Sequence, residues 1–149
     1  MAITQAIANS FKKELLDGAM SFKQTGGDTY KIALYISTAT LNSTTSNYIT
    51  GGEVANTGQY AAGGGALVNN GTSMTAGVAR CDFADRSFTG VTLTARGALI
   101  YNTTAGSGSS TTDAVCILNF GADKTATSGT FTIQFPAPTS TAAILRISG

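Results

Sequence analysis

Asp82 and Asp85 form a close acidic pair in the strand-rich part of the chain, which makes them candidates for a calcium site or a carboxylate dyad. Calcium usually takes at least about six oxygen ligands, and dedicated loops supply several acids within roughly a dozen residues. The segment CDFADRSF supplies only two acids. The spacing therefore favours a turn in which these carboxylates accept hydrogen bonds from nearby backbone amides, with Arg80 or Arg86 as a partner.

Histidine is absent from the chain, which excludes Ser-His-Asp and Cys-His nucleophiles, imidazole acid–base pairs and histidine-containing zinc sites. Serine and threonine are abundant, but no G-x-S-x-G elbow is present to expose a nucleophile. The eight acidic residues are scattered, and no spacing selects a facing pair of the glycosidase kind. We therefore expect a protein that is not an enzyme, with no catalytic residues, no cofactor and no metal.

The glycine run Gly63-Gly64-Gly65 suggests a phosphate-binding loop, because such loops are rich in glycine. A phosphate loop continues with Lys and then Ser or Thr at the start of a helix, and neither signal follows here. We expect these glycines instead to permit positive φ angles or a close approach of neighbouring backbones.

Length and charge favour one folded domain spanning residues 1–149. Apolar residues make up 42% of the chain and its formal net charge is +1, a balance that favours collapse over disorder. Such a near-neutral chain lacks the basic surface expected of a duplex nucleic-acid binder. The sequence contains neither an apolar run long enough to span a bilayer nor a signal-peptide pattern. We expect neither nucleic acid nor a membrane as a partner.

Cys81 and Cys116 are too few for a disulfide framework. Each is flanked by residues typical of strands, and small buried thiols are common in such places. The two cysteines therefore predict buried free thiols in a chain made in a reducing cytoplasm.

The N-terminal segment repeats a large apolar residue at every fourth position: Ile3, Ile7, Phe11 and Leu15. Polar residues occupy the positions between them, so the spacing predicts an amphipathic helix over about residues 3–17, with Gly18 as its C-terminal stop. The apolar stripe either packs on the sheet of its own chain or docks on a partner protein or a neighbouring copy.

Tyr48 and Tyr60 stand in otherwise polar stretches. Tyrosine is favoured at protein interfaces, so the two residues are candidate contact anchors together with the helical stripe. The alternative is that they cap the core of the domain.

Six later segments are rich in β-branched and aromatic residues: 30–37, 91–95, 98–102, 114–120, 130–135 and 142–147. Arg96-Gly97 between the second and third predicts one long bulged strand. The last two segments are expected to pair across Pro136-Ala137-Pro138. The pattern predicts a mainly β protein, an antiparallel β-sandwich of jelly-roll-like form over about residues 29–149, preceded by the helix.

Three stretches are predicted as loops because they are rich in Gly, Ser, Thr and Asn: 41–65, 69–77 and 103–112. Long uncharged loops on a rigid β framework usually act by surface contact, because the framework holds them in position.

Several phrases together resemble a family of small virion structural proteins of tailed bacteriophages: ITQAIANSFKKELLDG, GGDTYKIALYIS, CDFADRSF, LTARGALIYN, ILNFGADKT and TFTIQFP. The resemblance covers nearly the whole chain in the same order. Some members of that family resemble capsid cement or decoration proteins. The resemblance implies a protein on the outer capsid surface of the virion, made in the bacterial host cytoplasm, which binds the major capsid protein and bridges its subunits. It also implies self-association, with a trimer as one form.

Two other functions remain open at this stage. A tail, fibre or receptor-binding component suits the loops at 41–65 and 103–112, although the repeats or heptads usual in fibre shafts are missing. A carbohydrate-binding β-sandwich module would need flat exposed aromatic rings, and the chain has no Trp and five Tyr.

Overall fold

The computed structural model describes residues 2–104 and 110–148 of the chain. Over this part of the chain lie one helix and eight strands: β1 (Ala6–Ile7), α1 (Asn9–Leu16), β2 (Tyr30–Tyr35), β3 (Gly65–Ala66), β4 (Asn69–Thr75), β5 (Val78–Phe83), β6 (Arg86–Asn102), β7 (Ala114–Ile133) and β8 (Leu145–Ile147). Part of the predicted loop 103–112, residues 105–109, lies outside the described residues.

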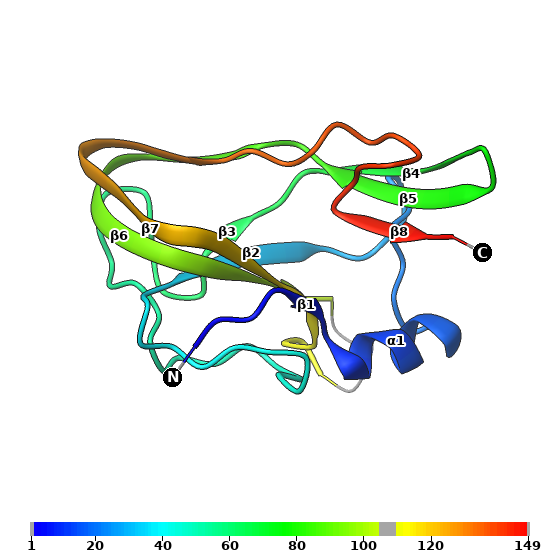
Figure 1. The fold of residues 1–149 in the computed structure, drawn as a ribbon, viewed down its shortest axis with the longest axis horizontal. Helices are drawn as coiled ribbons and strands as arrows, with labels where there is room; N and C mark the ends of the chain where they lie inside the picture. The colour runs from blue at the N-terminus through cyan, green and yellow to red at the C-terminus, as the bar shows by residue number, and fades with distance from the viewer. Residues whose placement is uncertain (1, 105–109, 149) are drawn as a thin grey trace.

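The strands form two antiparallel sheets, as the sequence predicts. The larger sheet has the order β1-β7-β6-β2-β3 and the smaller one has the order β4-β5-β8. Figure 1 shows the paired ribbon of β6 and β7 curving at one end of the molecule and returning above β2 toward the smaller sheet. This return gives the protein a sandwich-like arrangement of two layers, with α1 beside the end at which β5 and β8 lie.

The long strand β6 is bulged where Arg96-Gly97 predicts a bulge. Its pairing with β7 shifts register between Ala95 and Gly97, and again around Val91. Bulges add local twist and bend the strand that carries them. They allow β6 and β7 to turn from the larger sheet into the opposite layer without ending the ladder.

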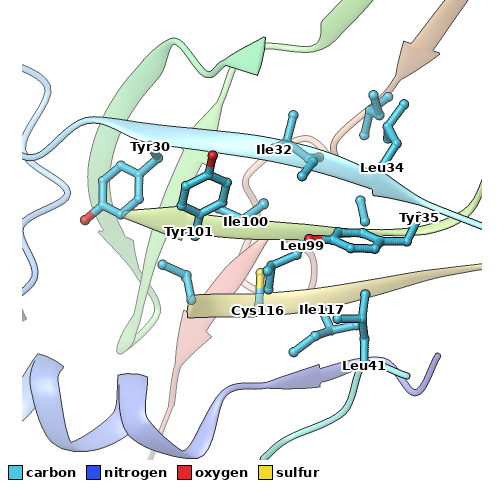
Figure 2. Packing of buried hydrophobic residues seen from close by; sticks show 14 of the residues in the cluster. Tyr30, Ile32, Leu34, Tyr35, Leu41, Leu99, Ile100, Tyr101, Cys116 and Ile117 are labelled. Carbon is cyan, nitrogen blue, oxygen red and sulfur yellow. The ribbon is translucent and has the colours of Figure 1, made fainter. Parts of the chain in front are cut away.

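The core is built on β2, whose residues Ile32 to Tyr35 are all fully buried. A run of consecutive buried residues means that both faces of the strand are covered. Figure 2 shows the side chains of β2 packed with Leu99 and Ile100 of β6, Ile117 of β7, and Leu41 from the stretch between β2 and β3. The predicted loop 41–65 therefore covers a face of the larger sheet.

The N-terminal helix is shorter than predicted and begins at Asn9. Residues 3–8 are extended: β1 pairs with β7, and Ile3 forms a parallel bridge with Leu41. The amide N–H groups of Thr4 and Ala8 donate to Leu41 and Val115. Because these backbone donors are used by other segments, the prediction of a helix over residues 3–8 is wrong. Gly18, with φ +73°, ends the helix as expected.

Two further predictions about strands are wrong. Residues 69–77 were expected as a loop, but β4 occupies most of this stretch and forms a hairpin with β5. Ala76 and Gly77 both have positive φ at the hairpin turn, as type I′ turns require. The expected pairing of segment 142–147 with segment 130–135 is absent, because β8 pairs with β5. In addition, segments 114–120 and 130–135 are joined in one strand, β7.

The predictions of positive φ in the glycine run and of buried free thiols are confirmed. Gly63 and Gly64 have positive φ, and a Cβ on Gly64 would lie 1.9 Å from the carbonyl oxygen of Ile32. Cys81 and Cys116 are buried free thiols. Burial raises the pKa of each thiol to about 12, so both remain protonated at neutral pH.

Candidate functional site

An apolar groove of about 350 Å³ separates α1 from the smaller sheet. One wall carries Ile7, Phe11, Leu15 and Leu16, from β1 and α1. The opposite wall carries Ala79 and Cys81 of β5 and the three residues of β8. Side chains from the two ends of the chain therefore face one another across this groove.

An aromatic cluster fixes the position of α1. Phe11 is 4% exposed and meets Phe22 edge to face, with ring centroids 5.8 Å apart. Phe22 in turn stacks on Tyr30 at 4.7 Å, and Phe83 of β5 contacts both rings. Because Phe11 points into this cluster, Leu15 lies at the rim of the groove and Leu16 points outward.

The groove has exposed apolar edges. Leu16 is 89% exposed, Ile147 is 61% exposed and Ile7 is 37% exposed. Full burial of one aliphatic side chain contributes about 1.5–3 kcal/mol, so this surface is costly to leave in water. Contiguous apolar surface of this kind typically marks a site of interaction with another molecule.

Three cations line the groove, and each is held by an uncharged oxygen. Lys12 Nζ donates to Asn9 Oδ1 at 3.2 Å. Arg80 Nη2 donates to Thr75 Oγ1 at 2.9 Å, and Arg146 Nη1 donates to the Ser140 carbonyl at 3.0 Å. None of the residues that line the groove is acidic.

The groove brings together three of the four residues of the predicted stripe. Ile7, Phe11 and Leu15 line it, although Ile7 comes from β1 and not from the helix. Ile3 is 6% exposed and does not line the groove, since it packs against Gly97 of β6. Sequence reasoning missed Leu16 and the whole β8 wall, whose position depends on pairing between distant segments.

Tyr48 and Tyr60 lie away from the groove and anchor the 41–65 stretch. Both hydroxyls donate to the carboxylate of Glu53, which also accepts the backbone N–H of Gly63 at 2.7 Å. The Tyr60 hydroxyl additionally accepts the N–H of Leu34 at 2.8 Å. Tyr60 is 1% exposed, which corrects its assignment as a contact residue, because it presents no surface to a partner.

Tyr48 is half-buried and stacks on Tyr101, with ring centroids 5.0 Å apart. Burial, reinforced by the hydrogen bond to Glu53, raises the pKa of Tyr48 to about 12. The hydroxyl therefore remains a protonated donor throughout the physiological range. This arrangement indicates a structural role for the cluster around Glu53.

Asp82 and Asp85 do not converge on one site. Asp85 Oδ1 accepts the backbone N–H of Phe135 at 2.8 Å, and Asp82 Oδ2 accepts a side-chain N–H of Asn70 at 2.9 Å. Neither carboxylate forms an ion pair with an arginine in the described part of the chain. Within residues 2–104 and 110–148, no group of three or more metal-ligating side chains could hold a metal ion.

A second hollow, of about 400 Å³, lies along β7 between Phe120 and Gln134. Its lining mixes Thr and Lys124 with Phe131, which is itself 7% exposed. Phe120, the other aromatic residue of this lining, is half-buried.

The described residues include no helix with the length and apolar character needed to cross a membrane. No family model matches the chain, and neither the curated proteins nor the solved structures give a significant match.

Proposed function

We propose that this protein is a structural component of a tailed-phage virion, and within that class a cement protein on the outer surface of the head. The groove between α1 and β8 would be its contact with the major capsid protein. The observation that carries the proposal is the exposed apolar rim of this groove, formed by Leu16 and Ile147. The resemblance of several phrases to small virion structural proteins supports the class of protein.

The groove suits a binder that acts in many copies. Three partly exposed aliphatic side chains supply a few kcal/mol at most, which is weak for a single contact. A copy that touches two or three capsid subunits gains effective concentration at its second contact, so modest contacts add up to firm attachment. A cement protein that bridges subunits makes several such contacts at once.

The remaining surface also suits a static role. The Glu53 carboxylate joins residues within the 41–65 stretch, and Tyr101 of β6 holds the stretch to the larger sheet, since its hydroxyl donates to the Gly63 carbonyl at 2.6 Å. Loops held in this way keep one shape, and binding therefore loses little conformational entropy. Self-association, including a trimer at three-fold positions of the shell, belongs to the same proposal.

Binding to phage heads that lack the protein tests the proposal. We expect saturable binding at a fixed copy number per head, and loss of binding when Ile147→Asp introduces a charge into the groove rim. Val68→Asp is the matched control, because Val68 is an aliphatic residue with similar exposure, 64%, and does not line the groove. Full binding by the Ile147 variant would remove the groove from the contact surface.

Attachment of the protein at the tail alone would instead favour the alternative of a tail or fibre component. Copy number separates the two positions, because a head surface offers hundreds of equivalent sites and a tail far fewer. Binding to sugars on a glycan array, with none to heads, would favour the carbohydrate-binding alternative.

A further inference from the structure

We infer that the groove between α1 and β8 accepts an acidic amphipathic segment of the partner, in which apolar side chains are flanked by Asp or Glu. This inference rests on the proposed docking role of the groove and specifies the chemistry of what fills it. The apolar side chains at the floor and rim of the groove indicate that the segment carries apolar side chains. The three cations of the groove indicate that it also carries acidic ones.

The apolar character of the segment is inferred from the side chains that form the walls of the groove. Phe11 and Cys81 lie deep in the groove, at 4% and 5% exposure, while Leu16 and Ile147 stand at its rim. A segment that inserts one or two aliphatic side chains would cover all four residues at once. Grooves of this kind bind amphipathic segments by their apolar face and leave the polar face at the edge.

The acidic character of the segment is inferred from the three cations of the groove, Lys12, Arg80 and Arg146. Within the described residues their partners are an amide oxygen, a hydroxyl and a carbonyl, and no carboxylate there forms an ion pair with any of them. Elsewhere in the described residues, Lys13 pairs with Asp17 and Arg96 pairs with Asp123 at 2.8 Å, while the other lysines and arginines form no ion pair either. The cations of the groove therefore create a local positive potential that is complementary to an acidic segment.

Arg80 gives the most specific indication. Its Nε and Nη1 atoms are buried and have no hydrogen-bond partner among the described residues. Leaving a buried donor of a charged group unsatisfied is costly. A carboxylate binds two N–H groups of a guanidinium in a planar, bidentate manner. The Nε–H and Nη1–H groups of Arg80 point to different sides of the guanidinium, so a Glu or Asp that reaches into the groove would satisfy one of them.

The apolar lining also distinguishes this site from a simple anion site. A free phosphate or a nucleic-acid backbone would meet the three cations but would leave Leu16 and Ile147 in water. An acidic peptide segment satisfies both parts of the surface. We therefore favour a protein segment as the occupant.

A pair of designed peptides tests the inference on the full-length protein. The first is a short helical peptide of Leu, Ala and Glu with Leu along one face, and its twin carries Lys in place of every Glu. Fluorescence anisotropy should show binding of the Glu peptide, weaker binding at high salt, and no binding of the Lys twin. Inorganic phosphate should not displace the Glu peptide.

Arg146→Glu should weaken binding of the Glu peptide by roughly three- to tenfold, because it replaces attraction with repulsion at an exposed position. Lys124→Glu is the matched control, since it makes the same change of charge on β7, outside the groove. Leu16→Ser should also weaken binding, whereas the control should leave it unchanged.

Three results would overturn the inference: equal binding of the two peptides, an unchanged affinity in Arg146→Glu, or concentration-dependent dimerisation that this variant abolishes. The last result would identify a second copy as the occupant. None of them bears on whether the protein decorates heads. Conversely, selective binding of the Glu peptide without attachment to heads would sustain the inference and refute the proposed virion role.

Discussion

Ile3 packs directly on Gly97, and the contact leaves no room for a side chain at residue 97. A Cβ at Gly97 would lie 2.8 Å from Cγ2 of Ile3 and 2.5 Å from the carbonyl oxygen of Leu118. The N-terminal segment thus lies over the bulge of β6. Because β1 and α1 follow Ile3 immediately, this contact helps to place one wall of the groove.

Gly97→Ala should therefore destabilise the protein by about 1–3 kcal/mol, the usual cost of an overpacked core position. Thermal unfolding measures the change directly. Gly129→Ala is the control, because a Cβ there meets only the Thr127 carbonyl oxygen, at 3.4 Å, and the residue has no positive φ. Equal melting temperatures for the Gly97 variant and the wild type would contradict this packing.

Glu53→Gln should destabilise the protein by about 2–3 kcal/mol, because hydrogen bonds to a charged acceptor are worth more than neutral ones. The carboxylate accepts three donors, and an amide would present an N–H to at least one of them. Chemical denaturation gives the free energy of unfolding, and limited proteolysis should show faster cleavage within residues 41–65.

Tyr48→Phe provides a graded comparison with Glu53→Gln. It removes one of the three donors and keeps the ring stacked on Tyr101, so we expect a loss near 1 kcal/mol. A larger effect of Tyr48→Phe than of Glu53→Gln would show that the Tyr48 hydroxyl matters more to this loop than the charge of its acceptor, and would contradict the prediction.

Glu14 should make stability depend on pH. Burial and the neighbouring carboxyl of Asp113 raise the pKa of Glu14 above its ordinary value of 4.5. The folded state then holds this proton at a higher pH than the unfolded state does. The contribution of Glu14 to stability is therefore greatest below pH 4.5 and is lost as pH rises through the folded pKa.

Glu14→Gln should remove this dependence and raise the melting temperature at neutral pH, because the amide carries no charge to repel Asp113. Melting curves across the acidic to neutral range measure the effect. Asp123→Asn is the control, since Asp123 is exposed, pairs with Arg96 and does not contribute to the pKa of Glu14. A variant profile that still falls above pH 4.5 as steeply as the wild type would contradict the assignment to Glu14.

The two thiols should resist alkylation at neutral pH while the protein is folded. Both have a pKa near 12 because burial disfavours the thiolate, which is the reactive form. Mass spectrometry after treatment with iodoacetamide should find both cysteines unmodified in native protein and modified in denaturant. Rapid labelling of native Cys116 would mean that β7 opens far more readily than its burial implies.

The sequence predicts the elements in which burial is strongest. The β-branched and aromatic segment 30–37 corresponds to β2, and Arg96-Gly97 indicates the bulge of β6. The predicted start of the helix is wrong, and the cause is geometric. Residues four apart share a face in a strand as well as in a helix, so Ile3 and Ile7 fit either structure. Backbone pairing with β7 and Leu41 decided between them.

The sequence predicts only one wall of the groove. Ile7, Phe11 and Leu15 stand out by their spacing, but the opposite wall depends on β8 pairing with β5. The strand β4 completes that sheet and carries the polar segment NNGTSMT, which has no apolar period to reveal it. Backbone hydrogen bonds to a neighbouring strand stabilise such a strand. Which strand is its neighbour depends on the tertiary structure, so the local sequence does not reveal it.

The joint construction of the groove by α1 and β8 has a consequence for assembly. About 130 residues separate its two walls along the chain, and the second wall forms only when β8 has docked onto β5. Recognition at this surface would thus depend on complete folding: a partner would bind chains in which the two walls have come together and would not bind those in which they have not.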